Sequence, residues 1–369
     1  MAARRLNIGL IGPGLVGKAL LTQISQQADA LRSEHGIVLC VLGIANSRAM
    51  LLQKMLPIDL STWQEELSSR GTPVDLYSFA QNFQRTKPGQ AVCMVDCTAS
   101  QAVPALYKRW LAQGFHVVTP NKRLGSGPLA DFRAAMAETR SGRSMFFGEA
   151  TVGAGLPVLS TLQTLLATGD RVQRIEGVLS GTLSYLFNVF TPGQRFSELV
   201  ADARRRGFTE PDPRDDLSGM DVARKAVILA RQCGVEVELV DVELESLVPS
   251  PLRGAASADE FLERLPEFDA GFEERVQDAA AKGCVLRYVA AIDVAAGACT
   301  VSLQAVPGSH AFAQLSSSDN IIAFTTARYH QQPLVIRGPG AGAEVTAAGV
   351  FGDVVQLARC LGPPGSGGM

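Results

Sequence analysis

The chain has 369 residues, of which 46% are hydrophobic and 19% charged, and its formal net charge is −2. This composition is typical of a globular protein of about two domains, by the usual ~150 residues for each, and it excludes a general attraction to nucleic acid or acidic membranes. No apolar stretch reaches the ~18 residues of a membrane span, and a strand expected from Leu6 leaves no room for a signal peptide, so we expect a cytoplasmic protein.

Strand-like and helix-like segments alternate through the first 150 residues. Strands are predicted at 6–12, 37–46, 91–99, 116–119 and 144–150, and helices at 15–28, 101–113 and 128–139. Alternation of this kind builds a parallel sheet with helices on both faces. The first part of the chain is therefore predicted to be a Rossmann-type, doubly wound α/β domain.

A glycine-rich turn follows the first predicted strand. Gly12-Pro-Gly-Leu-Val-Gly17 fits the GxGxxG pattern directly after an apolar strand and before a helix. Small residues there let the backbone approach a pyrophosphate, which the free N–H groups of the helix N-terminus attract. We expect Gly12, Gly14, Leu15, Val16 and Gly17 to contact a dinucleotide; the alternative is a glycine-rich turn without a ligand.

The ends of the next strands bear on the choice of cofactor. The second strand ends at Asn46 with Arg48 close behind, where NAD-binding proteins usually place a carboxylate for the ribose 2′-hydroxyl. Without that carboxylate, and with an arginine able to pair with a 2′-phosphate, NADP is acceptable, although Arg48 is equally compatible with a solvated surface position. Thr98 and Ser100 follow another parallel strand, where such sheets bind ligands.

Lys122 comes just after the strand that begins at His116. Strand C-termini of a doubly wound sheet face the cofactor crevice, so Lys122 is expected near the nicotinamide unless it is an ordinary loop lysine. Hydride transfer leaves an oxygen that needs charge stabilisation and a proton, and a lysine can supply both.

The pattern changes after Gly155. A helix is predicted at 156–167, a strand at 172–180, two or three helices up to Cys233, strands at 285–293, 300–306, 321–328 and 334–337, and a last helix at 346–361. The short Gly-containing link between the second and third strands indicates a hairpin, so a second α+β domain on an antiparallel or mixed sheet is expected.

Residues 207–225 carry the densest cluster of acids in the chain. Pro211 and Pro213 predict a rigid, non-helical loop, and Ser218 or Gly219 is expected to begin a helix that runs to about Cys233.

Four charged residues of this segment are candidates for chemistry. Asp221 and Lys225 share a helix face, a spacing that is also common in ordinary solvated ion pairs. Glu210 and Asp216 lie close by in the sequence. Several acids held near one lysine fit a small ligand that carries an ammonium group, which we expect Glu210, Asp216 and Asp221 to bind.

The cysteines and histidines give no support to other chemistry. Seven cysteines are scattered without a CxxC pair, which argues against a disulfide framework and a zinc site. Cys93 and Cys97 lie in a predicted core strand, where a thiol is usually inert. None of the four histidines falls in either lysine cluster.

Six motifs in a fixed order resemble homoserine dehydrogenase, the NAD(P)-dependent enzyme that interconverts L-aspartate 4-semialdehyde and L-homoserine. They are GPGLVG at 12–17, TPNK at 119–122, EATVGAGLP at 149–157, GTLSYLFN at 181–188, TEPDPRDDLSGMDVARK at 209–225 and GAGAEVTAAGVFGD at 340–353. The similarity runs from about residue 6 to residue 361 and is closest to the dehydrogenase half of bifunctional aspartokinase/homoserine dehydrogenases.

The resemblance implies roles for particular residues. Lys225 matches the proton donor and acceptor of the family, and Lys122 the lysine that lines cofactor and substrate. Glu210 and Asp221 match substrate-binding acids, with Thr182 and Asp216 as neighbours.

It also implies features that residue chemistry alone does not reveal. The backbone carbonyls of Glu149, Val152, Ala154 and Leu156 match a loop that binds sodium or potassium. Gly342 matches a glycine that returns to the cofactor.

On this basis residues 1–150 and 338–361 form the nucleotide-binding domain, 151–337 the catalytic and dimerisation domain of a homodimer, and 362–369 a disordered tail. Phe208 stands where the family usually has tyrosine, which removes a hydroxyl near the substrate. No aspartokinase or ACT region is present in the sequence, so feedback inhibition by threonine is not expected.

Two other functions are compatible with the residues. A phosphorylating semialdehyde dehydrogenase would need an activated cysteine. A non-catalytic nucleotide-sensing protein would use the Rossmann fold for binding alone.

Overall fold

The computed structural model describes residues 3–54, 56–84 and 90–361. The chain divides into two compact units: unit 1 is Met1–Gly155 with Gly342–Met369, and unit 2 is Leu156–Ala341. The tail predicted to be disordered, 362–369, lies outside the described residues. Among the helices that are described, none combines the length and the hydrophobicity that crossing a bilayer requires.

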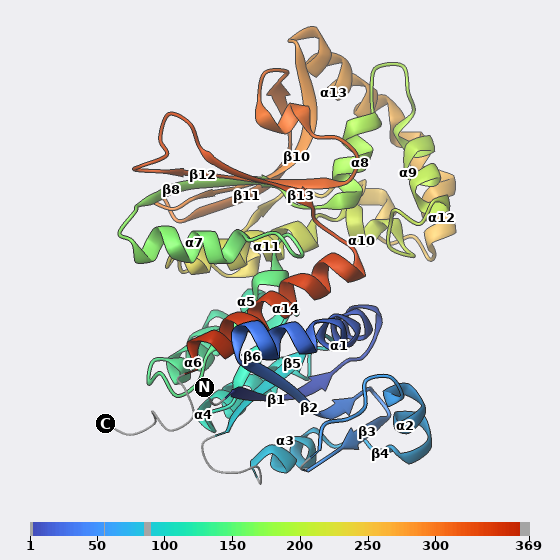
Figure 1. Ribbon diagram of the computed structural model, residues 1–369. Coiled ribbons are helices and arrows are strands. Elements are labelled where there is room, and N and C mark those ends of the chain that lie inside the picture. Colours follow the sequence, from blue (N-terminus) through green and yellow to red (C-terminus); the bar gives the residue numbers. More distant parts are fainter. Residues whose placement is uncertain (1–2, 55, 85–89, 362–369) are drawn as a thin grey trace. The chain divides into compact units, whose positions relative to one another are not determined.

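Unit 1 is built on a seven-stranded sheet of order β4-β3-β2-β1-β5-β6-β7 (Figure 1). Five strands are parallel neighbours: β1 (Arg4–Ile11), β2 (Ile37–Ala45), β5 (Ala91–Asp96), β6 (His116–Val118) and β7 (Phe146–Phe147). The predicted doubly wound sheet is thereby confirmed. Two short strands that were not predicted, β3 (Ala49–Leu52) and β4 (Thr72–Pro73), extend it antiparallel beyond β2.

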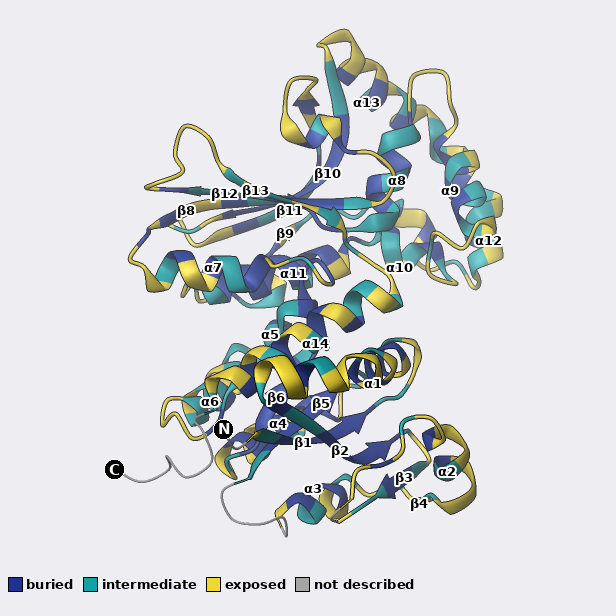
Figure 2. Ribbon diagram, viewed as in Figure 1, coloured by how far each residue is buried: buried dark blue, intermediate teal, exposed yellow. Residues whose placement is uncertain are grey.

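Helices bury both faces of this sheet, so β1 is buried from Leu6 to Ile11 and β5 from Val92 to Asp96. One core cluster receives side chains from α1 (Leu15–His35), α2 (Trp63–Arg70) and α14 (Ala343–Cys360). The other receives them from α3 (Leu76–Gln84), α4 (Tyr107–Ala112) and α6 (Leu129–Thr139). The burial colours of Figure 2 show the central strands of the sheet as buried.

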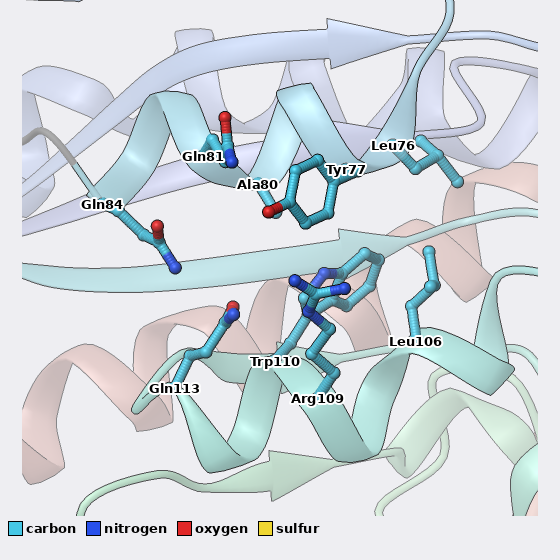
Figure 3. A pocket seen from close by; sticks show the side chains of 9 residues that line it. All are labelled: Leu76, Tyr77, Ala80, Gln81, Gln84, Leu106, Arg109, Trp110 and Gln113. Carbon is cyan, nitrogen blue, oxygen red and sulfur yellow. The ribbon is translucent and has the colours of Figure 1, made fainter.

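Helices α3 and α4 flank a small pocket on the second of these faces (Figure 3). The Arg109 guanidinium lies over the Tyr77 ring, 4.5 Å from its centroid, and Trp110 is buried beside it. None of the residues that line this pocket was predicted to bind cofactor or substrate.

Several boundaries in unit 1 differ from the prediction. The strand expected at 144–150 has only two residues, because a 3-10 turn at Glu149–Thr151 follows it directly. The helix expected at 101–113 begins as a 3-10 turn at Pro104–Leu106 before α4, since proline suits the first position of a helical turn. A short helix, α5 (Arg123–Ser126), follows Lys122.

Unit 2 contains a six-stranded sheet of order β13-β12-β8-β10-β11-β9. The strands are β8 (Val172–Val178), β9 (Glu243–Leu244), β10 (Cys284–Asp293), β11 (Ala298–Pro307), β12 (Asp319–Thr326) and β13 (Leu334–Pro339). β10 and β11 form the predicted hairpin, and the parallel pairing of β9 with β11 makes the sheet mixed, as expected.

The helices of unit 2 are more numerous than predicted. They are α7 (Val158–Ala167), α8 (Gly181–Val189), α9 (Phe196–Arg205), α10 (Pro213–Leu217), α11 (Met220–Gln232), α12 (Ala258–Arg264) and α13 (Asp269–Ala281). Four helices, rather than two or three, lie between β8 and Cys233 in the described chain, and α12 and α13 were not predicted.

The prediction that the Pro211–Pro213 segment cannot be helical is wrong at its second proline. Pro213 is the first residue of α10, a position where proline loses no helical hydrogen bond. Asp212 caps this helix by accepting a hydrogen bond from the Arg214 N–H at 3.0 Å. The next helix, α11, begins after Gly219 and ends at Gln232, as expected.

Candidate active site

The glycine-rich turn between β1 and α1 is closely packed. Gly12 has φ +85°, and a Cβ added to it would lie 2.6 Å from the Thr98 methyl carbon. A Cβ on Gly17 would lie only 2.4 Å from the Gly12 carbonyl oxygen. The turn therefore depends on both glycines, and it leaves the first N–H groups of α1 available to an anion because Gly14, the N-cap, has no capping side chain.

An open cleft of about 530 Å³ lies beside this turn in unit 1, within the range of small-ligand sites. Four of the predicted cofactor residues line it, namely Gly12, Gly14, Asn46 and Thr98. The other predicted residues, Leu15, Val16, Gly17, Arg48, Ser100, Lys122 and Gly342, are not among its lining residues. Leu15 is exposed, whereas Val16 packs against the core.

One wall of the cleft comes from α2, which was not predicted from the sequence. Trp63, Gln64 and Leu67 line the cleft, and Trp63 and Leu67 are buried. Their spacing of four residues is a helix-face signal that was present in the sequence. An aromatic and an aliphatic side chain give this end of the cleft an apolar wall suited to a flat ring such as adenine.

Asn46 has a defined orientation at the end of β2. Its Oδ1 accepts hydrogen bonds from the backbone N–H groups of Arg48 at 2.7 Å and Ala49 at 2.8 Å. Among the described residues, its Nδ2 group has no hydrogen-bond partner. Asn46 therefore presents donors, rather than an acceptor, where an NAD-binding protein usually presents a carboxylate.

The loops after β5 and β6 meet in unit 1. Asn121 Nδ2 donates to the Ser100 carbonyl at 2.9 Å. On the other side, the Lys122 carbonyl accepts from the Ser126 backbone N–H at 2.9 Å and from the Ser126 hydroxyl at 2.9 Å. The structure thus brings the predicted cofactor segment Thr98–Ser100 next to the segment that contains Lys122.

Lys225 occupies a buried position on α11 in unit 2. Its side chain is 9% exposed, and its Nζ lies 2.9 Å from an Asp221 carboxylate oxygen. The same Nζ donates a hydrogen bond to the Leu179 carbonyl at 2.7 Å. A solvated helix pair would leave the lysine exposed, so the structure does not support that alternative.

Asp216, one of the acids predicted near Lys225, is hydrogen-bonded to two other predicted residues. Asp216 accepts hydrogen bonds from the Thr182 hydroxyl at 2.8 Å and from the Glu210 backbone N–H at 2.8 Å. The pKa of Asp216 is raised overall, because burial and the neighbouring charges of Asp215 and Asp221 outweigh the two hydrogen bonds, which lower it. The Asp221 side chain is 53% exposed, so it can receive a cationic group from solution while it pairs with Lys225.

The loop predicted to bind a monovalent cation turns sharply. Gly153 and Ala154 both have positive φ, +78° and +54°, which is uncommon for alanine. In addition, the Asp353 carboxylate of α14 accepts a hydrogen bond from the Glu149 N–H at 2.9 Å.

The donor chemistry of this loop fits an alkali ion. Glu149, Val152 and Ala154 belong to unit 1, and Leu156 is the first residue of unit 2. Within the described ranges, no group of three His, Cys, Asp or Glu side chains could hold a metal ion. Backbone carbonyls are hard oxygen ligands, so the predicted set suits a hard cation rather than a transition metal.

The predicted residues are distributed over both units. Lys122 belongs to unit 1, whereas Lys225, Glu210, Asp216, Asp221 and Thr182 belong to unit 2. Gly342 is the residue at which the chain re-enters unit 1, and it precedes α14 as its N-cap.

Two family models match this chain. One, described as homoserine dehydrogenase, matches residues 157–355, and the other, described as the homoserine dehydrogenase NAD binding domain, matches residues 12–147.

The chain is also similar in sequence and in structure to known proteins. A bifunctional aspartokinase/homoserine dehydrogenase 2 of Arabidopsis thaliana, described as chloroplastic, is 51% identical over 97% of this chain but only 39% of its own length. The homoserine dehydrogenase of Schizosaccharomyces pombe is 42% identical over 97% of both proteins. A crystal structure of a Candida auris protein of unknown function superposes with a TM-score of 0.90 at 36% identity, over 97% of this chain and 99% of that one.

Proposed function

The chain belongs to the homoserine dehydrogenase family, an NAD(P)-dependent oxidoreductase family, and from that membership we propose that it interconverts L-aspartate 4-semialdehyde and L-homoserine. The chain spans about two fifths of the length of the bifunctional relatives, so the proposal concerns the dehydrogenase reaction alone. It would serve the synthesis of threonine, methionine and isoleucine.

One observation carries the proposal: a buried lysine is paired with a partly exposed carboxylate. Lys225 Nζ lies 2.9 Å from Asp221 and donates to the Leu179 carbonyl at 2.7 Å. Asp216 accepts hydrogen bonds from the Thr182 hydroxyl and from the Glu210 backbone N–H. A lysine in this setting can stabilise negative charge on a substrate oxygen and pass it a proton. Partly exposed acids beside it can bind the substrate ammonium group.

We assign the chemical roles accordingly. The nicotinamide, when bound, supplies or accepts the hydride. Lys225 delivers a proton to the oxygen that becomes the homoserine hydroxyl, and removes it in the reverse direction. Lys122, from unit 1, contributes a second positive charge at the nicotinamide end, and Glu210, Asp221, Asp216 and Thr182 orient the amino acid part of the substrate.

We propose NADP as the preferred cofactor, because the end of β2 offers donors. Asn46 presents Nδ2, and the exposed Arg48 follows it. Asn46→Asp retains the two bonds of Oδ1 and replaces Nδ2 with an acceptor that repels a 2′-phosphate. We expect the ratio of kcat/KM for NADPH to that for NADH to fall by roughly tenfold to a hundredfold, the scale of one charge-assisted hydrogen bond.

Steady-state kinetics with both cofactors would check this expectation. Arg48→Ala is a second variant, in which the ratio of kcat/KM for NADPH to that for NADH should also fall. Arg143→Ala is the matched control, because Arg143 is an exposed arginine of unit 1 whose only hydrogen-bond partner, within the described part of the chain, is nearby Ser141. A ratio that stays constant in Asn46→Asp would remove this residue from cofactor discrimination.

A monovalent cation and a homodimer are further parts of the proposal. The sharp turn at Gly153 and Ala154 and the carbonyl donor set support sodium or potassium binding by the loop of Glu149, Val152, Ala154 and Leu156. The edge strand β13, with Val335 42% exposed, supports pairing of unit 2 with a second copy. The cytoplasmic location remains a prediction from the sequence.

The decisive experiment is the oxidation of NADPH by the purified protein in the presence of aspartate semialdehyde, repeated with NADH. We expect turnover that requires the semialdehyde. Tight NADPH binding without any turnover would instead favour the nucleotide-sensing alternative.

Thiol alkylation separates this proposal from a phosphorylating semialdehyde dehydrogenase. Cys97 lines the cleft, but burial strongly raises the pKa of its thiol, and burial raises the pKa of Cys233 to about 12. Both thiols stay protonated and unreactive at neutral pH, so iodoacetamide should lower activity by less than about twofold while it labels the exposed Cys360. Complete, substrate-protected inactivation would indicate a cysteine nucleophile.

A further inference from the structure

Beyond the residues assigned above, we propose that Asp96, Tyr107 and Asn121 form a positioning unit that sets the backbone at Lys122 relative to the cofactor loop Thr98–Ser100. The role given to Lys122 rests on the proposed function. The positioning unit itself is defined by hydrogen bonds within unit 1.

The three residues come from neighbouring elements of the sheet. Asp96 is the last residue of β5, Tyr107 begins α4, and Asn121 follows β6, which pairs with β5. All three are buried, with exposures of 0%, 0% and 5%. They lie at the carboxyl ends of parallel strands, the edge where doubly wound sheets bind ligands.

Asp96 is the acceptor at the centre of the unit. Its Oδ1 accepts from the Thr98 N–H at 2.7 Å. Its Oδ2 accepts from the Tyr107 hydroxyl and, at 3.2 Å, from Asn121 Nδ2. Three donors converge on a group that can only accept when it is ionised, so the surroundings are built for a carboxylate.

Thr119, which follows β6, links Asp96 and Asn121 through its hydroxyl. Its hydroxyl donates to the Asp96 carbonyl at 2.8 Å and accepts from the Asn121 N–H at 2.9 Å. The Asp96 backbone and side chain are therefore both tied to the segment that leads to Lys122.

Asn121 joins the two loops. Its Nδ2 bridges the Ser100 carbonyl at 2.9 Å and Asp96, and its Oδ1 accepts from the Arg123 N–H at 2.9 Å. The residues on both sides of Lys122 are thus held by a single side chain. A shift of Asp96 would move Asn121, and Lys122 would move with it.

A merely structural role explains this cluster poorly. A buried carboxylate carries a desolvation penalty. Burial raises the pKa of Asp96, although its hydrogen bonds lower it. Apolar side chains would fill the same space without that penalty. A fully bonded polar network instead holds its members in one geometry, and catalytic placement within a fraction of an ångström is worth large factors in rate.

The test compares Asp96→Asn and Tyr107→Phe with wild type. In Asp96→Asn, the new amide NH2 group must face at least one of the three groups that donate hydrogen bonds to the wild-type carboxylate. In Tyr107→Phe, the hydroxyl that donates to Asp96 is lost. We expect both to lower kcat by roughly tenfold to a hundredfold and to raise the Kd for NADPH, measured by protein fluorescence. Amide hydrogen exchange in residues 119–126 should rise several-fold in the absence of any ligand.

Thr326→Val is the matched control. It also removes a hydroxyl bonded to a buried carboxylate, because Thr326 donates to Asp170 at 2.7 Å, but neither residue belongs to the positioning unit or bonds to a predicted site residue. We expect a comparable loss of Tm with unchanged kcat and unchanged exchange in residues 119–126.

The proposal is overturned if Asp96→Asn and Tyr107→Phe lose thermal stability like the control but retain wild-type kcat, NADPH affinity and exchange. If the wild-type protein fails to reduce aspartate semialdehyde, the proposed function fails, whereas the exchange and NADPH measurements still decide whether the unit positions the two loops.

Discussion

Lys225→Ala is expected to lower kcat by at least ~100-fold, the typical cost of removing one group that stabilises developing charge. The wild-type Nζ is held by Asp221 at 2.9 Å and by the Leu179 carbonyl at 2.7 Å, and alanine has no amine that could deliver the proton from this position. The affinity for NADPH should change little, because the cleft that we assign to the cofactor is lined by residues of unit 1. Steady-state turnover and fluorescence titration with NADPH would measure both quantities.

Two further variants separate chemistry from packing. Lys225→Met retains an apolar stem in the buried position and should lose as much turnover as Lys225→Ala. Lys282→Ala removes an exposed lysine at the end of α13 and should behave as wild type. Near-normal turnover in Lys225→Met would show that the amine takes no part in the reaction.

Gly17→Ala is expected to weaken NADPH binding by at least ~10-fold and to destabilise unit 1 by about 1–3 kcal/mol, the usual cost of overpacking. The added methyl would lie 2.4 Å from the Gly12 carbonyl oxygen, which is backbone and cannot rotate away. The turn must therefore move, and with it the N–H groups of α1 that we expect to bind the pyrophosphate. Calorimetric titration and thermal unfolding would detect the two effects.

Gly352→Ala provides a close comparison for this variant. Gly352 is also a helical glycine of unit 1, in α14, but an added Cβ there would meet no atom within 4 Å. Alanine is the better helix former by about 1 kcal/mol, so stability should be equal or higher and NADPH affinity unchanged. If Gly17→Ala and Gly352→Ala bound NADPH equally well, the turn would not be the pyrophosphate site.

The sequence predicted several long, periodic elements and missed the short ones, and it also missed α13, whose 13 residues bury only Phe272, Val276 and Ala279. β1, α11 and the β10–β11 hairpin are evident from their patterns, because each is long enough to show an apolar face. In contrast, β3 and β4 have four and two residues, too few for a period to show. Helix α2 is short and largely polar, so its Trp63–Leu67 pair was overlooked and one wall of the cleft with it.

Prolines and helix starts explain another error. Pro211 and Pro213 were both interpreted as helix breakers, yet Pro213 begins α10 behind the capping Asp212. A proline is incompatible with a helix interior but favourable at its first position, and the sequence does not say which of the two a given proline occupies. Only the capping hydrogen bond from Arg214 to Asp212 settles the point.

The sequence by itself determined the family, the glycine-rich turn and the spacing of Asp221 and Lys225, because these depend on local properties: small residues, helix starts and positions one turn apart. Only the tertiary structure decided that Lys225 is buried, that Asn46 presents donors to the cleft, and that Asp96, Tyr107 and Asn121 meet. The bonds among these last three join residues up to 25 positions apart. They form because β5 and β6 are neighbours in the sheet, and strand order is a property of the whole fold rather than of any segment.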